Sequence, residues 1–479
     1  MDKIETEVTD GSAVSFDLAV LGAGSAGFAA AIRATEQGAR VALINHGTIG
    51  GTCVNVGCIP SKALIRSAEA THVGRAHPFD GVPRAAGTVD WPAVRDQKDR
   101  LVEQLRQAKY VDVLEAYPMI TLFEQRGTVE TSGSVTLADG TRIETERLVV
   151  TAGSSPSIPD IPGLADAGFL DSTSVQELDA LPASLAVLGS GSVGLELGQA
   201  FARLGVDVTV LARSTLLSKE DPALGGALAG YLREEGIDVR EHFGFVRVEM
   251  SGDRRAIIGR DPDGSEIRVE VDALLVATGR QPNTSGFGLR AAGIEIGPRG
   301  EIVVDEYGRT SNPHIFAAGD VTGDPMYVYV AARAGAFAAE NALSDSSLPL
   351  DLSVVPRVTF TDPSVAVVGL TEEAAREAGF DPITSVLPME HVPRALAAHD
   401  TRGFVKLVAD AATRRILGAA ILAPEAVEMI MEPTLAIKHG LTVEDLVDTL
   451  HPYLTFGEGV RLAAQTFDKE VAALSCCAA

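Results

Sequence analysis

The sequence is poor in cysteine, with four cysteines in 479 residues. This number is too small for the disulfide framework of a secreted protein. In a reducing compartment, a few cysteines are more often catalytic or metal-binding than structural. The four form two pairs, Cys53 with Cys58 and Cys476 with Cys477, one pair near each end of the chain. Any thiol chemistry is therefore confined to these two places.

Positive charge is also scarce, because 40 Lys and Arg residues face 65 Asp and Glu, for a net charge of −25. Binding to nucleic acid or to an anionic membrane needs clustered Lys and Arg, so both functions are disfavoured. No apolar run of membrane-spanning length is free of glycine, and the first residues, 1–5, show no signal-peptide pattern. We therefore expect a cytoplasmic protein with no stable membrane association.

Glycine, in contrast, is abundant, with 48 residues, and two sets of glycines lie in similar surroundings. The first set is Gly22, Gly24 and Gly27, within predicted strand, helix and strand segments at 16–21, 28–37 and 40–45. The second set is Gly189, Gly191 and Gly194, within equivalent segments at 185–188, 195–204 and 206–211. In such a Gly-x-Gly-x-x-Gly unit the glycines allow a tight turn, close approach of the backbone to a pyrophosphate, and close packing of helix on strand. The chain thus predicts two dinucleotide sites.

The residues after the second strand of each unit indicate which dinucleotide it binds. An acid there bonds a ribose diol, whereas an Arg accommodates a 2′-phosphate. The second unit has Arg213 in this region, with Lys219 six residues later and no acid at the strand end, which favours NADPH over NADH. The first unit has Asn45, a neutral residue that can still bond hydroxyls. Asn45 alone therefore leaves the first cofactor open.

The rest of the chain suggests a further domain. A charged amphipathic helix is predicted over 91–115 and short strands over 123–150. From about residue 351, predicted strands such as 365–368 and 404–407 alternate with helices, and a last helix is predicted over 459–474. We expect a separate C-terminal domain here.

The most specific stretch is Gly50–Lys62, Gly-Gly-Thr-Cys-Val-Asn-Val-Gly-Cys-Ile-Pro-Ser-Lys, in which four residues separate Cys53 from Cys58. A disulfide across this spacing requires the backbone to turn back on itself, which Gly57 and a following helix start make possible. A thiolate near a helix N-terminus is expected to have a lowered pKa, and therefore good nucleophilicity and metal affinity.

This stretch, together with Ala277–Arg280 and Ala317–Asp320, resembles the flavoprotein disulfide reductases, and the resemblance covers nearly the whole chain from Phe16 onward. It implies an α/β fold with two Rossmann-like dinucleotide-binding domains and a C-terminal α+β dimerisation domain. The implied FAD-binding domain is discontinuous, at 1–153 and 281–350, with an NADPH-binding domain at 154–280 and the dimerisation domain at 351–479. The implied assembly is a homodimer in which each active site is shared between subunits.

The resemblance also implies roles for individual residues. FAD is expected to be bound by the first glycine set and by Asn45, Gly51, Thr52, Lys62, Gly153 and Asp320. NADPH is expected to be bound by the second glycine set and by Arg213, Lys219 and Gly279. Cys58 is expected to face the flavin and Cys53 to exchange with substrate, while Lys62 pairs with Glu196.

The C-terminal region departs from the disulfide-reducing members of that family, in which a His five residues before a Glu protonates the leaving thiolate. Here Tyr453 stands five residues before Glu458, and His451 stands seven residues before it. We therefore expect His451 to be structural and Tyr453 to take the catalytic position. A phenol with a pKa of about 10 is a poor acid at neutral pH. A metal ion that accepts two electrons needs no such acid.

Cys476 and Cys477 are adjacent, so a disulfide between them would be a strained ring, whereas two thiolates suit a soft metal. The tail 474–478 and the segment 453–459 resemble those of the mercuric reductases, a branch of the same family. This resemblance implies NADPH-dependent reduction of Hg(II) to Hg(0). Hg(II), arriving as a thiolate complex, would be taken by Cys476 and Cys477 and passed to Cys53 and Cys58 of the partner subunit.

Two other functions remain open at this point. The first is an NADPH-dependent disulfide reductase of the thioredoxin or glutathione type, which Tyr453 disfavours. The second is a non-catalytic metal-binding flavoprotein. A lipoamide dehydrogenase is disfavoured by Arg213, which indicates NADPH.

Overall fold

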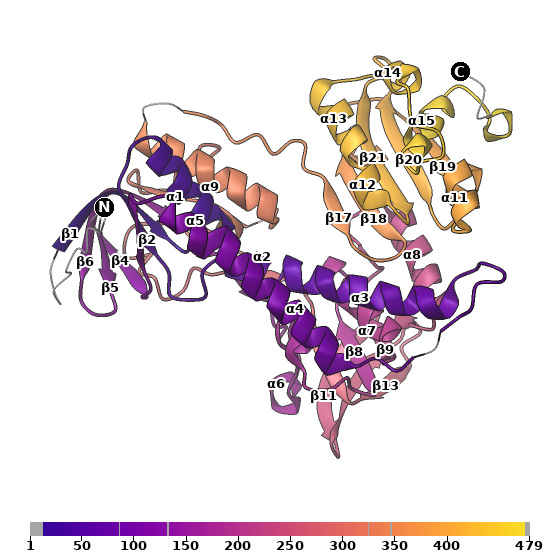
Figure 1. The fold of residues 1–479 in the computed structure, drawn as a ribbon, viewed down its shortest axis with the longest axis horizontal. Helices are drawn as coiled ribbons and strands as arrows, with labels where there is room; N and C mark the ends of the chain where they lie inside the picture. The colour runs from indigo at the N-terminus through magenta and orange to yellow at the C-terminus, as the bar shows by residue number, and fades with distance from the viewer. Residues whose placement is uncertain (1–12, 86, 132–133, 324, 345–346, 475–479) are drawn as a thin grey trace. The chain divides into compact units, whose positions relative to one another are not determined.

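The computed structural model describes residues 13–85, 87–131, 134–323, 325–344 and 347–474. The chain divides into two compact units, whose elements are labelled in Figure 1. Unit 1 contains Met1–Ala63, Arg95–Ser157 and Gly279–Asp351, and unit 2 contains Leu64–Val94, Ile158–Thr278 and Leu352–Ala479. Among the residues described, no helix combines the length and apolarity that crossing a bilayer requires.

A seven-stranded sheet forms the centre of unit 1, in the order β3-β2-β1-β6-β5-β4, with β16 beside β6. Its strands are β1 (Ala13–Leu21), β2 (Val41–Ile44), β3 (Ile120–Phe123), β4 (Gly127–Thr131), β5 (Ser134–Leu137), β6 (Arg142–Val150) and β16 (Ile315–Ala317). β1, β2, β3, β6 and β16 run parallel, and all four residues of β2 are buried, as expected for a parallel strand covered on both faces. A separate antiparallel pair consists of β7 (Ser154–Pro156) and β15 (Arg280–Pro282).

Two long helices of unit 1, α1 (Ser25–Glu36) and α9 (Val328–Leu343), lie against each other. A Cβ atom added at Gly335 would lie 2.0 Å from the Ala26 carbonyl oxygen, so only glycine permits this close packing. The predicted helix over 91–115 is helical throughout but changes type. It consists of α4 (Trp91–Arg106), a π-helical turn η1 (Gln107–Val111) and α5 (Asp112–Glu115). π-helical turns are often found at functional sites.

Unit 2 contains a second parallel sheet, in the order β10-β9-β8-β14. Its strands are β8 (Ser184–Leu188), β9 (Asp207–Leu211), β10 (Asp238–Arg240) and β14 (Ala273–Val276). Helix α7 (Ser192–Arg203) connects β8 to β9, and α8 (Pro222–Glu234) follows β9. A three-stranded antiparallel sheet consists of β11 (Gly244–Ser251), β12 (Arg254–Arg260) and β13 (Glu266–Val271). Both glycine sets therefore lie in the strand–helix–strand units that the sequence predicts.

The C-terminal part of unit 2 is a five-stranded antiparallel sheet in the order β17-β18-β21-β20-β19. Its strands are β17 (Arg357–Thr359), β18 (Ser364–Gly369), β19 (Pro382–Pro388), β20 (Phe404–Asp410) and β21 (Ile416–Ala423). Its helices are α10 (Glu372–Glu377), α11 (Pro393–Ala398), α12 (Ala426–Met429), α13 (Met431–His439), α14 (Val443–Asp448) and α15 (Glu458–Gln465). The predicted α/β fold class is confirmed.

The predicted helix over 459–474 is wrong at its C-terminal end, because α15 stops at Gln465. The hydroxyl of Thr466 donates to the Ala463 carbonyl at 2.9 Å. Such side-chain bonds to the backbone compete with helix continuation. Only a short 3-10 turn, Val471–Ala473, follows.

Candidate functional site

The first glycine loop has the geometry that a dinucleotide requires. Gly22 has φ +114°, and a Cβ there would lie 2.4 Å from the Thr151 carbonyl oxygen. A Cβ on Gly27 would lie 1.8 Å from the Gly22 carbonyl oxygen. A Cβ on Gly24 would meet nothing closer than 3.8 Å. The protein itself therefore requires glycine at the first and third positions, and the second leaves backbone exposed for a ligand.

The second glycine loop repeats this pattern. A Cβ on Gly189, with φ +119°, would lie 2.3 Å from the Ala277 carbonyl oxygen, and one on Gly194 would lie 2.4 Å from the Gly189 carbonyl oxygen. A Cβ on Gly191 would meet no atom within 4 Å. The helices α1 and α7 begin directly after the middle glycine of each loop, so each loop lies at a helix N-terminus, which favours a pyrophosphate.

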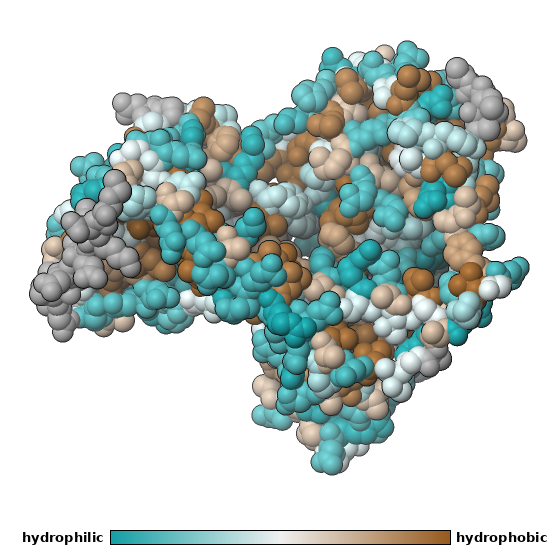
Figure 2. Space-filling model, viewed as in Figure 1, coloured by the Kyte–Doolittle hydropathy of each residue, from teal (hydrophilic) through white to brown (hydrophobic). Residues whose placement is uncertain are grey.

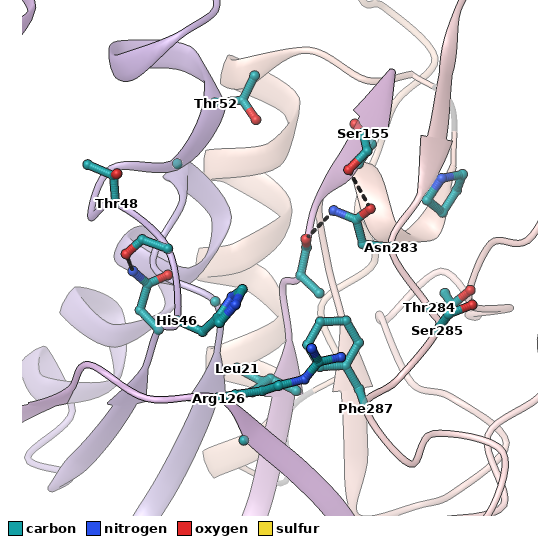
Figure 3. A pocket seen from close by; sticks show the side chains of 18 of the residues that line it. Leu21, His46, Thr48, Thr52, Arg126, Ser155, Asn283, Thr284, Ser285 and Phe287 are labelled. Atoms are coloured by element: carbon teal, nitrogen blue, oxygen red, sulfur yellow. Dashed lines mark hydrogen bonds between the residues drawn. The ribbon is translucent and has the colours of Figure 1, made fainter. Parts of the chain in front are cut away.

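A cavity of about 670 Å³ lies in unit 1, next to the first glycine loop (Figure 3). It is lined by four predicted site residues, Gly22, Asn45, Gly51 and Thr52. Its volume is within the range of small-molecule and cofactor sites. The described residues that line it include His46 and Arg126 but no Asp or Glu. A glycine loop that leaves backbone exposed, joined to a cavity without negative charge, fits a dinucleotide such as FAD.

Asp320, the predicted ribityl contact, lies at the end of β16. Its Oδ2 accepts a hydrogen bond from the Ser154 hydroxyl at 2.6 Å, and the Arg280 Nε lies 3.9 Å from it. Arg280 also donates to the Ser154 carbonyl at 2.6 Å. Gly153, with φ +68°, directly precedes this group. Ser154 is not a predicted site residue, and Arg280 stands out only within the motif Ala277–Arg280, because the three residues are far apart in the chain and no spacing links them.

The cysteine stretch lies directly on the first glycine loop. A Cβ on Gly51 would lie 2.7 Å from the Gly24 Cα, so two glycines allow α2 (Gly51–Asn55) to pack there. Cys53 is half-buried in α2, and Cys58 is exposed at the first residue of α3 (Cys58–Ala76). A Cβ on Gly57 would lie 2.8 Å from the Thr52 carbonyl oxygen, so glycine permits the turn between the two helices.

Both cysteines are free thiols in the structure, and their side chains are hydrogen-bonded to each other. The predicted lowering of pKa is wrong for Cys53. Its pKa is raised, first by the hydrogen bond to Cys58 and then by burial. After one proton has left the pair, the remaining thiol donates a hydrogen bond to the thiolate. Removing the second proton is therefore harder than removing the first.

The predicted helix over 91–115 supports the cysteine stretch, a contact that the sequence did not indicate. Arg106 donates to the Asn55 side chain at 3.2 Å, and Asn55 donates to the Ile49 and Gly51 carbonyls. Tyr110, in the π-helical turn, is hydrogen-bonded to Ser25, and burial raises the pKa of its phenol. Nothing in the sequence marks Tyr110, because its position depends on the π-helical turn.

Lys62 and Glu196 lie on different helices. Lys62 is on α3, one turn after Cys58, in unit 1. Glu196 is on α7 in unit 2, is 5% exposed, and accepts a hydrogen bond from the Phe360 backbone N–H at 2.9 Å. Their pairing stays a prediction.

The residues predicted to select NADPH are exposed after the second strand of the second glycine unit. Arg213 follows β9, and Lys219 lies in the segment before α8. Gly279 has φ +120°, and a Cβ there would meet nothing within 4 Å. It lies where the chain returns from unit 2 to unit 1. The roles of the three residues stay predictions.

In the C-terminal loop, the two candidates for the catalytic position differ in their exposure to solvent. Tyr453 is 60% exposed. The His451 side chain is 7% exposed; its Nδ1 lies 2.9 Å from the Thr449 carbonyl oxygen and its Nε2 lies 2.8 Å from Glu432 Oε1. His451 therefore anchors the loop. Glu458 is 3% exposed at the start of α15, and its Oε2 has no hydrogen-bond partner within the described part of the chain.

Because both ring nitrogens of His451 face oxygen acceptors, the protonated ring fits the site best, and the hydrogen bond to Glu432 raises the pKa of His451. This contribution to stability is full below the unfolded pKa of about 6.5 and is lost as pH rises through the raised folded pKa. Glu432→Gln should therefore lower the free energy of unfolding by on the order of 1 kcal/mol at about pH 5.5. The difference from wild type should shrink at about pH 9, as measured by urea unfolding. A difference that stays constant with pH would contradict the assignment.

The predicted metal ligands Cys476 and Cys477 lie outside the residues that the structure describes. Their delivery role stays a prediction.

Comparison with known proteins identifies the family. Residues 16–335 match the family model of the pyridine nucleotide-disulphide oxidoreductases, and residues 355–464 match that family's dimerisation domain. The solved structures that resemble this chain include the HOCl-induced flavoprotein disulfide reductase RclA from Escherichia coli. It has a TM-score of 0.84 and 30% identity, with 95% of this chain and 100% of that chain covered. LpdA from Mycobacterium tuberculosis has a TM-score of 0.83 at the same identity and coverage.

The relatives that are more similar in sequence include three mercuric reductases. The protein from Lysinibacillus sphaericus is 46% identical, over 97% of this chain and 85% of its own length. The protein from Shigella flexneri is 47% identical, over 98% and 84%. The protein from Streptomyces lividans is 45% identical, over 97% and 98%. The predicted resemblance is confirmed: the chain belongs to the pyridine nucleotide-disulphide oxidoreductase family and, within it, to the mercuric reductases.

Proposed function

We propose that the protein reduces Hg(II) to Hg(0) with electrons from NADPH. The observation that carries this proposal is the 45–47% identity to mercuric reductases over nearly the full chain. The overall reaction is Hg(SR)₂ + NADPH + H⁺ → Hg(0) + NADP⁺ + 2 RSH. Two electrons leave NADPH as a hydride, the mercury–sulfur bonds break, and the product is an uncharged atom.

The cofactors are FAD and NADPH. The first glycine loop and the cavity of unit 1 would hold FAD, with Asp320 near its ribityl chain, and the second loop would hold NADPH, with Arg213 and Lys219 on its 2′-phosphate. FAD, when bound, accepts the electron pair as a hydride and passes it on. These assignments correspond to an FAD-binding domain at 1–153 and 281–350, an NADPH-binding domain at 154–280 and a dimerisation domain at 351–479.

Cys53 and Cys58 would hold the metal ion at the site of reduction. Thiolates are the preferred ligands of a soft metal, and binding to a thiol displaces its proton. The hydrogen bond to Cys58 and burial raise the pKa of Cys53, so metal binding there would be accompanied by release of the thiol proton. Tyr453 would lie near the metal, and its exposure in the single chain supports a contact made outside its own subunit.

The protein would act as a cytoplasmic homodimer with shared active sites. The dimerisation-domain match supports two subunits. The C-terminal region also exposes apolar side chains, namely Met431, Leu435, Leu450, Tyr453 and Leu454. Figure 2 shows apolar residues among hydrophilic ones over this region. A second copy would bury these side chains and bring Tyr453 to the cysteine pair of its partner.

The decisive test is NADPH oxidation by the purified holoenzyme under excess small thiol, with and without Hg(II), while evolved mercury vapour is trapped. We expect one Hg(0) per NADPH consumed. Turnover with glutathione disulfide or thioredoxin, and none with Hg(II), would instead establish the disulfide-reductase alternative. Metal binding without NADPH consumption would establish the non-catalytic alternative.

A second experiment tests the role of the tail. The double variant Cys476→Ala/Cys477→Ala should raise the KM for thiol-complexed Hg(II) by about tenfold or more, because the metal must then reach the inner pair without ligand exchange at the tail. Weakly complexed Hg(II) should be less affected. Steady-state kinetics at several thiol concentrations measures this. Kinetics equal to wild type at high thiol would rule out the relay.

A further inference from the structure

We propose that the adenosine end of the first dinucleotide site does not select a free ribose diol and accepts a ribose that carries a 2′-phosphate. The residues responsible are Asn45, which stands in the place of the usual acid, and Arg126, which supplies positive charge. The inference rests on the proposed function only for the placement of FAD in this site.

The side chain of Asn45 is engaged with the protein itself. Its Oδ1 accepts a hydrogen bond from the Ala23 backbone N–H at 3.2 Å, and its Nδ2 donates to the Gly47 carbonyl. Ala23 belongs to the glycine loop and Gly47 to the turn after β2. Asn45 thus joins the two backbone segments at the edge of the cavity. A carboxylate at this position could accept from Ala23 but could not donate to Gly47.

Asn45 also removes the charge that would discriminate between nucleotides. An acid at the end of the second strand accepts charge-assisted hydrogen bonds from a ribose diol and repels a phosphate. A neutral amide with one N–H and one lone pair already used does neither strongly. The described residues that line the cavity include no carboxylate that could take the role of the missing acid. In a chain with a net charge of −25, this cavity is therefore unusual.

The guanidinium of Arg126 would favour a phosphate in the cavity. His46 and Arg126 both line the pocket (Figure 3). The Arg126 guanidinium donates to the Gly286 carbonyl at 3.1 Å and lies 5.4 Å from the centre of the Phe287 ring. These contacts hold the guanidinium on the cavity wall, so binding an anion costs little side-chain entropy. The second glycine unit likewise has no acid at the end of its second strand, and Arg213 follows that strand.

The test measures nucleotide binding by the full-length protein after its flavin has been removed, using the quenching of flavin fluorescence. The probes are FAD, an FAD analogue with 2′-deoxyadenosine, and an FAD analogue with a 2′-phosphate on the adenosine ribose. We expect the three dissociation constants to agree within about threefold, since no acid in the site reads the diol. A site that binds either analogue more than about tenfold more weakly than FAD would overturn the proposal.

Two variants separate the contributions, and Arg142→Gln, a change at an exposed arginine of unit 1 outside this cavity, is the matched control. Arg126→Gln should weaken the phosphorylated analogue about three- to tenfold relative to FAD. Asn45→Asp should weaken it by about tenfold or more relative to FAD, because the new carboxylate repels the phosphate. Unchanged ratios in both variants would overturn the assigned roles. Because no mercury or NADPH is present, the result is independent of whether Hg(II) is the substrate.

Discussion

Replacing either Cys53 or Cys58 by alanine is expected to lower Hg(II)-dependent NADPH oxidation by more than about a thousandfold. The two thiols lie at the turn between α2 and α3 and are hydrogen-bonded to each other, so they act as one unit. A single remaining thiol can neither close a disulfide nor hold Hg(II) between two thiolates. Measurements of initial rates at saturating NADPH, with vapour trapping, would give the loss.

The double variant Cys53→Ala/Cys58→Ala is the natural comparison. Residues that act as a unit show non-additive losses, so the double variant should be about as inactive as either single variant. Flavin content and NADPH binding serve as controls and should remain close to wild type, because neither cysteine is among the residues that line the cavity of unit 1. A single variant that retains about a tenth of the activity would show that one thiol suffices, and the two-thiolate site would be wrong.

The nucleotide-binding units could be predicted from sequence because their glycines are required locally. Gly22 and Gly27 would clash with nearby backbone if they carried a Cβ, and the same holds for Gly189 and Gly194. Such requirements depend on a short segment and its flanking strands, so a spacing pattern captures them. The spacing of Tyr453 before Glu458 likewise gave the expectation that His451 is structural, which its burial and its two hydrogen bonds now support.

Contacts between distant segments could not be predicted in this way. The sequence shows that Asn45 is a neutral residue in the place of an acid, but its bonds to Ala23 and Gly47 depend on how two loops meet. The raised pKa of Cys53 depends on the distance and burial that the turn at Gly57 produces, and helix position alone gave the wrong direction. The end of α15 depends on the bonding of Thr466. Each of these needs three-dimensional neighbours that no pattern in one sequence supplies.

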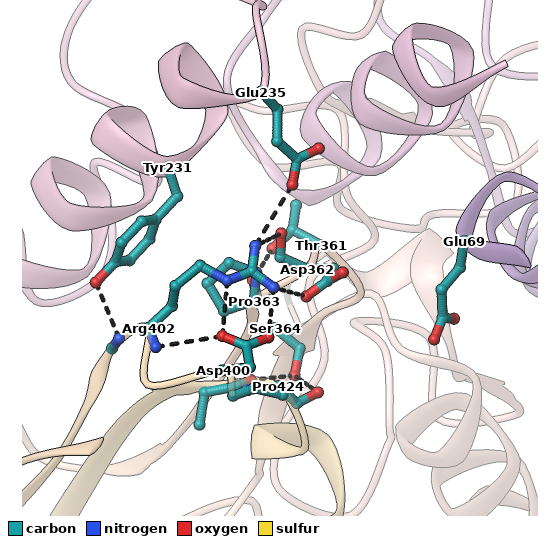
Figure 4. Close-up of polar contacts among 12 residues, drawn as sticks. Glu69, Tyr231, Glu235, Thr361, Asp362, Pro363, Ser364, Asp400, Arg402 and Pro424 are labelled. Atoms are coloured by element: carbon teal, nitrogen blue, oxygen red, sulfur yellow. Dashed lines mark hydrogen bonds and ion pairs between the residues drawn. The ribbon is translucent and has the colours of Figure 1, made fainter. Parts of the chain in front are cut away.

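A polar face of α7 makes contacts that the sequence did not indicate. Ser192, Glu196, Gln199 and Arg203 all bond residues between 359 and 362. The last of them, Arg203, is 5% exposed at its side chain and pairs with Glu235 at 2.6 Å and with Asp362 at 2.8 Å. Arg402 pairs with the other oxygen of Asp362 at 2.7 Å (Figure 4). The face links the helix of the second glycine unit to the C-terminal sheet.

Arg203→Met is expected to lower the free energy of unfolding by about 3–5 kcal/mol, the second large effect that we predict. The substitution keeps the packing volume but leaves Glu235 and Asp362 with one guanidinium instead of two. Burial opposes the charge of Asp362, and Arg402 and Arg203 outweigh it, so the pKa of this carboxyl is lowered. Such a contribution is present above the unfolded pKa of about 3.9 and is lost as pH falls through the lowered folded pKa. The difference between wild type and variant should therefore be full at neutral pH and should narrow in acid.

Arg268→Met is the matched control, because Arg268 also pairs with two acids, Glu249 at 2.6 Å and Glu270 at 2.8 Å, but its side chain is 43% exposed. Exposed pairs are screened by water and salt and contribute little to stability, so this variant should unfold close to wild type. Urea unfolding of both variants is monitored separately by flavin fluorescence and by circular dichroism. Because each arginine pairs with two acids, the difference between the two losses in free energy of unfolding measures the effect of burial. Equal losses in the two variants would show that the number of ion pairs matters and burial does not. A small loss in both would show that α7 is held to the C-terminal sheet by its other bonds, and that Arg203 contributes little to this link.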